Sequence, residues 1–267
     1  MEFETLKLDT NGAIGSLTLS RPGKLNALSV QVLQEIERAA HWFDARPEIR
    51  VVIVRGDGRA FTAGADLGDS ARSLERMKEM TWVERREIGY TGSRMASALE
   101  GMRALTIAQL HGYCIGGGCV IATACDFRIA ADDTVFSIPE VDLGIPLSWG
   151  GIPRLVREIG PLKTKELVIT CRRFDAVEAA ALGLINETVP AAQLEARVTT
   201  LAQELAAKPS VPALQTKAQV NAYANALAVT AFADGDLLVG ARSDPDSQAA
   251  AMEYAQRVFG KNRGHAD

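Results

Sequence analysis

Apolar and polar residues are arranged along the first part of the chain in a pattern that predicts strands followed by a helix. The segment LTLS at 17–20 alternates with the two-residue period of a strand, and a turn follows at 21–23. After Ser29 the apolar residues recur at helical spacing, and the uninterrupted run VVIV at 51–54 indicates a buried strand. The apolar face of the predicted helix consists of Leu33, Ile36, Ala40 and Phe43.

The same order of helix and strand recurs in the middle of the chain. Apolar residues at helical spacing in 95–102 are followed by the strand-like segment LTIAQL at 105–110 and by three glycines at 116–118. Residues 104–125 carry no Asp, Glu, Lys or Arg and match a membrane span in length, but four glycines and two polar side chains favour a buried strand that leads into a buried helix. The pattern predicts an α/β fold of layered β-β-α units, although a doubly wound sheet would give a similar pattern.

The last part of the chain has a different character. Asp175 and Glu178 form a capping-box-like start for a short helix that Gly183 ends. The remaining sequence is rich in Ala, Leu, Gln and Lys and reads as helical to its end. We therefore divide the chain into a core with the functional site, 1–195, and a C-terminal helical subdomain, 196–267.

Composition excludes several classes of function. The 267 residues are 47% apolar, which is enough to bury one sizeable core. The 29 basic and 33 acidic residues give a formal net charge of -4 without a block of like charges, which disfavours nucleic-acid binding. The four cysteines lack C-x-x-C spacing and the N-terminus is too acidic for a secretory signal, so we expect a reduced, cytoplasmic protein without a membrane anchor.

The common catalytic templates are missing from this sequence. It contains no G-x-S-x-G, G-x-x-x-x-G-K or H-E-x-x-H motif and only three histidines, at 41, 111 and 265. Hydrolase, phosphoryl-transfer and zinc chemistry are therefore disfavoured, and we expect no metal site. Because the glycines at 116–118 are contiguous and no acidic partner follows at the right distance, they make a poor dinucleotide fingerprint.

The glycine triplet suits a different role. Between a strand and a helix it lets a ligand approach the backbone, and the helix N-terminus presents unpaired N–H groups to a negatively charged oxygen. The alternative is that the glycines only allow tight packing of strand against helix. A second segment, Phe61-Thr62-Ala63-Gly64-Ala65-Asp66, follows the buried strand at 51–54 and again places small residues where a side chain would block the main chain.

Together these two segments resemble the crotonase (enoyl-CoA hydratase/isomerase) superfamily. Its two oxyanion-hole motifs correspond here to FTAGADL at 61–67 and GYCIGGG at 112–118. The resemblance continues through RPGKLNALS at 21–29, CDFRIAADDTVFSIPEVDLGI at 125–145 and the segment 179–189, and so covers almost the whole chain. It implies a crotonase-type spiral of repeated β-β-α units with a C-terminal helical subdomain.

The resemblance also implies a set of binding residues. Ala65 and Gly117 would each donate a backbone N–H to a thioester oxygen. Coenzyme A would belong to the substrate, with no separate cofactor, and its adenine and pantetheine would follow a path lined by Lys24, Ala27, Ala63, Asp66 and Leu67. Alternatively, Lys24 is a solvated loop residue and Asp66 only caps the next helix. Near the end of the chain, Phe259 and Lys261 match positions that contact coenzyme A from a neighbouring subunit.

The acid/base residues depart from the pattern of typical hydratases. Those enzymes carry one glutamate directly after G-G-G-C and a second in a downstream Pro-Glu pair. Here Val120 occupies the first position, and Glu140, after Pro139, is the only acidic group that the resemblance places in the pocket. One glutamate is sufficient to move a proton between two carbons. The alternative role for Glu140 is a helix cap or a surface salt bridge.

The segment after Glu140 also departs from ordinary hydratases. Ser148 and Trp149 stand where those enzymes have glycine and alanine, which predicts a narrowed acyl pocket with Val120 and Leu147. The phrase D-L-G-I-P resembles decarboxylase-like members, but Leu147 and Asp66 replace a tyrosine and a histidine of that group.

We interpret the chain as an acyl-CoA enzyme of the hydratase/isomerase group, with Ala65, Gly117 and Glu140 as its catalytic residues. A decarboxylase-like enzyme, a catalytically silent acyl-CoA binder and an interaction protein that has kept the fold are the alternatives. The resemblance further implies a homotrimer or homohexamer built by the C-terminal helices.

Overall fold

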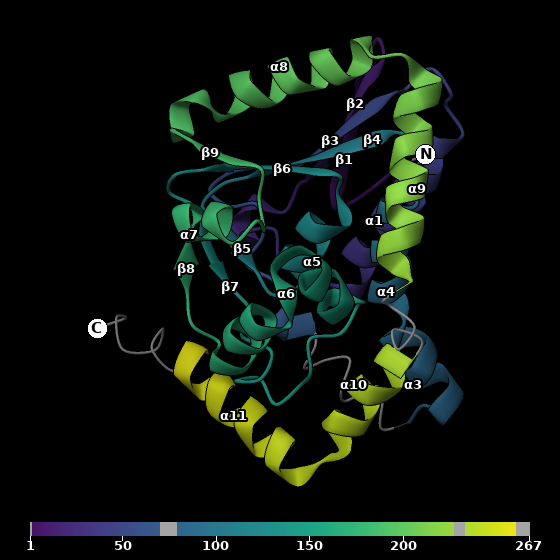
Figure 1. Cartoon of the computed structure of the whole chain (residues 1–267). Coiled ribbons are helices and arrows are strands. Elements are labelled where there is room, and N and C mark those ends of the chain that lie inside the picture. The colour runs from purple at the N-terminus through teal and green to yellow at the C-terminus, as the bar shows by residue number, and fades with distance from the viewer. Residues whose placement is uncertain (1, 70–78, 227–232, 260–267) are drawn as a thin grey trace.

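The computed structural model describes residues 2–69, 79–226 and 233–259 (Figure 1). Its larger sheet has six strands in the order β1-β2-β3-β4-β6-β9. All neighbouring pairs are parallel except the hairpin of β1 and β2. The strands are β1 (Leu6–Asn11), β2 (Ile14–Leu19), β3 (Val51–Gly56), β4 (Leu105–Leu110), β6 (Phe127–Ala131) and β9 (Glu187–Val189).

A smaller sheet lies beside the functional segments. It has the strand order β5-β7-β8, in which β5 pairs parallel with β7 and β8 pairs antiparallel with β7. The strands are β5 (Tyr113–Ile115), β7 (Val135–Ser137) and β8 (Phe174–Asp175). The uncharged stretch 104–125 forms β4, β5 and the helix α5 (Gly117–Ala124), so the expected buried strand and buried helix are confirmed, with one short strand between them. In the described part of the chain, no helix is both long and apolar enough to span a bilayer.

Helices pack on both faces of the larger sheet. The remaining described helices are α1 (Val30–Asp44), α3 (Trp82–Gly89), α4 (Thr91–Glu100), α6 (Gly151–Thr170), α7 (Ala176–Ala181), α8 (Leu194–Ala207), α9 (Ser210–Asn225), α10 (Asp234–Ser243) and α11 (Pro245–Phe259). As predicted, α1 begins after Ser29, whose hydroxyl accepts a hydrogen bond from the Val32 N–H. This cap satisfies one of the N–H groups that a helix start leaves unpaired.

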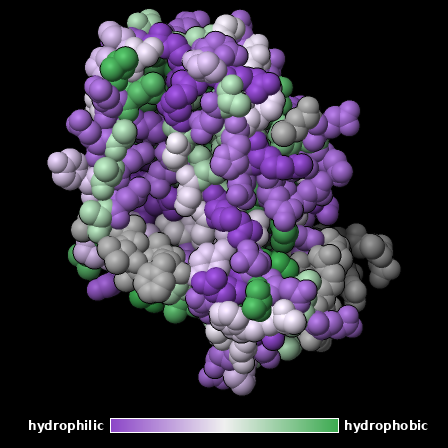
Figure 2. Space-filling view, turned by 90° about the vertical axis from the view of Figure 1, so that its right-hand side faces the viewer, coloured by the Kyte–Doolittle hydropathy of each residue, from purple (hydrophilic) through white to green (hydrophobic). Residues whose placement is uncertain are grey.

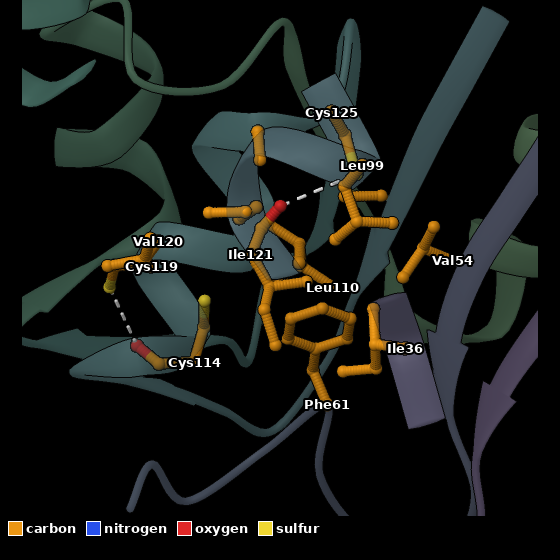
Figure 3. Packing of buried hydrophobic residues seen from close by; sticks show 14 of the residues in the cluster. Ile36, Val54, Phe61, Leu99, Leu110, Cys114, Cys119, Val120, Ile121 and Cys125 are labelled. Atoms are coloured by element: carbon orange, nitrogen blue, oxygen red, sulfur yellow. Dashed lines mark hydrogen bonds between the residues drawn. The ribbon is translucent and has the colours of Figure 1, made fainter. Parts of the chain in front are cut away.

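The main core lies between one face of the sheet and helices α1, α4 and α5. The four residues predicted for the apolar face of α1 are buried, as are Met95 and Leu99 on α4. Figure 3 shows the Phe61 ring beside Ile36 of α1 and Ile121 of α5. Because Phe61 is fully buried there, it anchors the start of the 61–66 segment.

A second, smaller core covers the opposite face of the sheet. Val51, Ile107 and Ile129 from three adjacent strands pack against Leu194 and Val198 of α8. In Figure 1, α8 lies across the sheet. Burial of these side chains stabilises the fold by about 1.5–3 kcal/mol for each large residue, and it ties the first C-terminal helix to the strands.

The C-terminal helices beyond α8 lie along the edge and the base of the molecule (Figure 1). Helix α9 fully buries none of its residues. Helix α10 packs against α3 instead, where Asp236 accepts a hydrogen bond from Arg86 and Gly235 lies under the ring of Tyr90. The division at residue 195 falls one residue after α8 begins and stays a prediction.

Candidate active site

The 61–66 segment is held between two other parts of the chain. On one side, the Ala63 N–H donates to the Leu25 carbonyl, and Leu28 pairs with Ala65 in an isolated parallel bridge. On the other side, Thr62 exchanges backbone hydrogen bonds with Tyr113 and Ile115 of β5. The tertiary structure therefore brings the two glycine-containing motifs, which are about fifty residues apart in the sequence, side by side.

Each glycine of the triplet faces a different neighbour that leaves no room for a side chain. A Cβ at Gly116, which has a φ of 52°, would lie 2.5 Å from Glu140 Oε1. A Cβ at Gly118 would lie 2.6 Å from Thr62 Cγ2, and one at Gly117 would collide with the benzene ring of Trp149. Real Cβ atoms do not approach other atoms this closely, so a side chain at any of the three positions would force its neighbour or the backbone to shift.

Two backbone N–H groups are available at this junction. Gly117 is the first residue of α5, so its N–H has no partner within the helix. In the bridge between Leu28 and Ala65, the flanking groups form the hydrogen bonds, from Leu28 N to Gly64 O and from Asp66 N to Leu28 O. Among the described residues, neither Ala65 nor Gly117 has an acceptor for its N–H. The N-terminus of α5 adds a partial positive charge that favours an anion.

Glu140 reaches this junction from the smaller sheet. Strand β7 pairs with β5, and the carbonyl of its last residue, Ser137, accepts from the Gly116 N–H at 2.8 Å. Three residues later the Glu140 carboxylate lies against Gly116. Its Oε2 is buried and has no hydrogen-bond partner among the described residues, and no described ion pair involves it. The helix-cap and salt-bridge alternatives for Glu140 are therefore not observed.

Burial raises the pKa of Glu140 to about 7, although a hydrogen bond from its own backbone N–H opposes the shift. In the folded protein this carboxyl keeps its proton up to neutral pH, whereas an ordinary glutamate loses it near 4.5. A carboxyl with a pKa near 7 can both accept and return a proton at neutral pH.

The raised pKa predicts a change in stability with pH. Between about pH 5 and pH 8 the folded Glu140 holds its proton more tightly than the unfolded chain does, so the free energy of unfolding falls as pH rises. Glu140→Gln lacks this ionisation, and we expect it to be more stable than wild type at pH 8 by about 2–3 kcal/mol, with the difference shrinking toward pH 5. Urea unfolding at the two pH values measures this difference.

Asp142→Asn is the matched control, because it changes an exposed carboxylate in the same turn whose partner is Arg257 at 3.3 Å. This control variant should follow the wild-type pH profile. A stability difference between Glu140→Gln and wild type that is the same at pH 5 and pH 8 would contradict a Glu140 carboxyl group whose pKa is raised by burial.

The four expected pocket residues lie together around the start of α6. Val120 and Leu147 are buried, and a Cβ at Gly151 would lie 2.9 Å and 2.8 Å from their side chains. Ser148 is buried beside them, and Trp149 lies over Gly117 and Gly92. Val120, at the position of the first glutamate of typical hydratases, is thus an apolar residue next to the apolar Leu147.

The candidate coenzyme A residues form a second group around Arg21. The Arg21 guanidinium donates to the Ala27 carbonyl and, at 2.8 Å, to Asp66 Oδ2. Lys24 lies 3.8 Å from the same carboxylate, and its side chain is 58% exposed, which agrees with a solvated loop residue. Asp66 also accepts from the Asp69 N–H at 3.1 Å, as a helix cap would.

The Asp66 carboxylate is therefore already bound on both oxygens. Burial alone would raise the pKa of Asp66, but the Arg21 guanidinium and the Asp69 N–H outweigh it and hold the pKa below its usual value. Asp66 thus caps the residues that follow it and also ties them to the loop that carries Arg21. Ala63 is held by Leu25, and Leu67 directly follows Asp66.

Several residues at the site have no part in the sequence analysis. In the sequence Arg21 is the first residue of the predicted turn and of the RPGKLNALS segment, but its contacts with Ala27 and Asp66 depend on the fold. Asp234 accepts a hydrogen bond from the Gly150 N–H, across 84 positions of sequence, which no local pattern signals. Lys261 and the side chain of Phe259 lie outside the described residues.

Within 2–69, 79–226 and 233–259, no three His, Cys, Asp or Glu residues are grouped to hold a metal ion.

Comparisons with known proteins give the same assignment as these motifs. The family model for enoyl-CoA hydratase/isomerase matches residues 9–258. A probable enoyl-CoA hydratase of Mycobacterium bovis is 39% identical over 203 residues, which are 74% of this chain and 75% of that protein. A peroxisomal Delta(3,5)-Delta(2,4)-dienoyl-CoA isomerase of Arabidopsis thaliana is 34% identical over 230 residues, 81% of this chain and 80% of that protein.

The fold is also shared with solved structures. The crystal structure of an enoyl-CoA hydratase from Mycobacterium avium subsp. paratuberculosis has a TM-score of 0.85 and 25% identity, and covers 94% of this chain and 99% of that one. The fold is thus the crotonase fold, as the motifs predicted. The chain belongs to the enoyl-CoA hydratase/isomerase family of the crotonase superfamily, whose enzymes are lyases or isomerases.

Proposed function

We propose that this enzyme moves a proton on an acyl-CoA thioester whose enolate is stabilised by the N–H groups of Ala65 and Gly117. Glu140 is its single acid/base. The observation that carries this proposal is the buried carboxylate of Glu140, whose Oε2 has no hydrogen-bond partner among the described residues, which has a pKa of about 7 and which lies against the glycine that precedes the Gly117 donor. The family supplies the acyl-CoA substrate class.

The chemistry follows from these positions. Glu140 removes a proton from the carbon next to the thioester, and the electron pair moves onto the carbonyl oxygen. Two backbone donors stabilise the resulting charge, and removing one such donor typically costs about 2.7–4 kcal/mol in the transition state. The protonated Glu140 then returns the proton to the same carbon or to another carbon of the conjugated system.

Val120 decides between the reactions that the family performs. Addition of water across the double bond in typical hydratases uses two carboxylates, and Val120 supplies none of that chemistry. Val120 is buried beside Leu147 and Gly151, so a charged side chain at position 120 would be costly. We therefore propose double-bond isomerisation or α-proton exchange as the main reaction, with hydration slow.

A panel of enoyl-, dienoyl- and malonyl-type CoA thioesters in deuterated solvent tests this function by mass spectrometry. We expect deuterium uptake at the α-carbon with at least one enoyl or dienoyl substrate. Loss of carbon dioxide from the malonyl-type thioester without exchange elsewhere would favour the decarboxylase-like alternative. If no thioester exchanges or turns over, the silent binder becomes the better description. If crotonyl-CoA is hydrated as fast as the best 3-enoyl or dienoyl substrate exchanges its α-proton, the single-base mechanism is wrong.

We also propose that the coenzyme A moiety binds along the loop 21–28 and the segment 63–67. Arg21 and Lys24 add positive charge at the loop, and Arg21 fixes the loop to both Ala27 and Asp66. In this arrangement Asp66 organises the binding loop rather than contacting the ligand, which leaves Lys24 as the exposed cation available to a phosphate. The reaction needs no separate cofactor, and we propose a cytoplasmic location.

We further propose a trimer or a dimer of trimers as the working assembly. The side of the molecule that carries α9 is mostly hydrophilic, and its hydrophobic side chains form separate patches (Figure 2). These patches are the apolar surface that subunit contacts on this side would cover. On α9 itself, Val211, Val220 and Tyr223 are between 58% and 82% exposed. Light scattering at micromolar concentration should give three or six times the 28.6 kDa chain mass, and a monodisperse monomer would contradict the assembly.

A further inference from the structure

Trp149 adopts a backbone conformation that needs support from its surroundings. Its φ is 61°, in the left-handed region that bulky residues rarely occupy, and Gly150 follows with a φ of 69°. Such a conformation is unfavourable for a bulky residue and persists only when neighbouring groups fix it. In this protein it directs the indole between Gly92 of α4 and Gly117 of α5.

Packing of the indole does not by itself fix Trp149 in this position. A pocket of about 420 Å³ that is partly open to solvent is lined by Trp149, Gly150 and Pro153, by Ser97 of α4, and by charged side chains that include Arg154. Trp149 therefore contacts Gly92 and Gly117 through its indole, is one of the residues that line the pocket, and is only partly buried. Because a partly buried side chain at the edge of a pocket has fewer packing contacts than a core residue, the position of Trp149 also depends on how its backbone is held.

Two side chains, Arg154 and Asp234, bind the backbone at Trp149 and Gly150, and Glu100 holds Arg154 in place. We refer to these three residues as the Trp149 support. Arg154 donates to the Gly150 carbonyl at 3.0 Å and to the Trp149 carbonyl at 3.3 Å. Glu100 fixes Arg154 through an ion pair of 2.6 Å. From the other side of the peptide, the buried Asp234 carboxylate accepts the Gly150 N–H.

Asp234 is the first residue of α10, so the C-terminal region reaches back to the pocket of its own chain. Helix α10 is placed by α3, where Asp236 accepts from Arg86 at 2.9 Å and from the Tyr90 hydroxyl at 3.3 Å. The contact between Gly235 and the Tyr90 ring adds to this docking. These contacts fix Asp234 opposite Gly150 independently of the loop that it binds.

We propose that Asp234 and Arg154 are positioning residues that hold the Trp149 indole against Gly117 and thereby set which acyl groups fit beside the oxyanion hole. The proposal rests on the proposed function for the identity of that hole. Loss of the support lets the indole move toward the pocket that Trp149 lines. The space released beside Gly117 then admits bulkier acyl groups.

Tryptophan fluorescence reads this position without any turnover. The chain has three tryptophans, so a Trp42→Phe, Trp82→Phe background leaves Trp149 as the only emitter. In that background we expect Asp234→Ala to shift the emission of Trp149 and to increase its quenching by acrylamide. Asp234→Asn keeps an oxygen that can accept a hydrogen bond from the Gly150 N–H. Its Trp149 emission and acrylamide quenching should therefore stay close to those of the parent background.

Kinetics with a branched and an unbranched enoyl-CoA provides the second readout. Space for about one methylene group changes kcat/KM by 10-fold or more, so we expect Asp234→Ala to shift the ratio toward the branched thioester by roughly tenfold. Asp236→Asn is the matched control, since it removes a carboxylate charge from the same helix, keeps an oxygen that can accept from Arg86, and leaves the Asp234 contact to Gly150 in place. If Asp234→Ala does not fold, Arg154→Lys replaces it, because the shorter cation keeps its charge beside Glu100 but loses the paired donors of the guanidinium.

The two readouts separate the possible failures. Unchanged fluorescence and unchanged selectivity in Asp234→Ala, or changes in Asp234→Asn and Asp236→Asn as large as those in Asp234→Ala, overturn the proposal. A change in Trp149 fluorescence in a protein that turns over no thioester would support the positioning role while contradicting the proposed function.

Discussion

Glu140→Gln is expected to lower turnover of any accepted acyl-CoA by about two to four orders of magnitude. The amide has the shape of the carboxyl group, but it can neither accept nor return a proton. Affinity for the thioester should change little, because the donors of Ala65 and Gly117 remain in place. Deuterium exchange at the α-carbon, measured at saturating thioester, isolates the step that this residue performs.

The pH dependence provides an internal check on this variant. Wild-type exchange at limiting substrate should fall below about pH 7, because protonation removes the base, whereas the residual exchange of Glu140→Gln should lack that inflection. Asp142→Asn should exchange like wild type, since Asp142 is on the surface. Equal exchange rates in wild type and Glu140→Gln would show that Glu140 is not the base.

Gly117→Pro should reduce turnover by about 10²–10³-fold because it deletes one of the two proposed oxyanion donors. Proline is tolerated at the first position of a helix, so α5 should still form. However, any side chain at this position also collides with Trp149. The single substitution therefore combines a lost N–H with a displaced indole.

A background of Trp149→Ala separates the two effects. It removes the indole, so Gly117→Ala and Gly117→Pro can be compared with room for both side chains. In this background we expect Gly117→Ala to retain most of the remaining activity and Gly117→Pro to lose it, while circular dichroism reports the fold of each. If both double variants are equally active, the N–H of Gly117 does not bind the oxyanion.

The sequence by itself determined the local elements and the two motifs. The helical spacing after Ser29 and the apolar run at 51–54 predicted α1 and β3 correctly, because burial of one face or of both faces imposes a period that is visible in the residues. The resemblance identified the family and the glycine segments, since a close backbone approach leaves only small residues at fixed positions. It also identified the position of Glu140.

Only the tertiary structure decided how these parts act on one another. The pKa of Glu140 depends on what buries it, and its contact with Gly116 depends on the pairing of β5 with β7. Likewise, α8 covers the sheet and Asp234 supports the turn at Gly150, although nothing in their local sequence indicates those partners. Contacts between distant segments are set by how preformed helices and strands pack, and a local hydrophobic period specifies which face is buried without specifying against what.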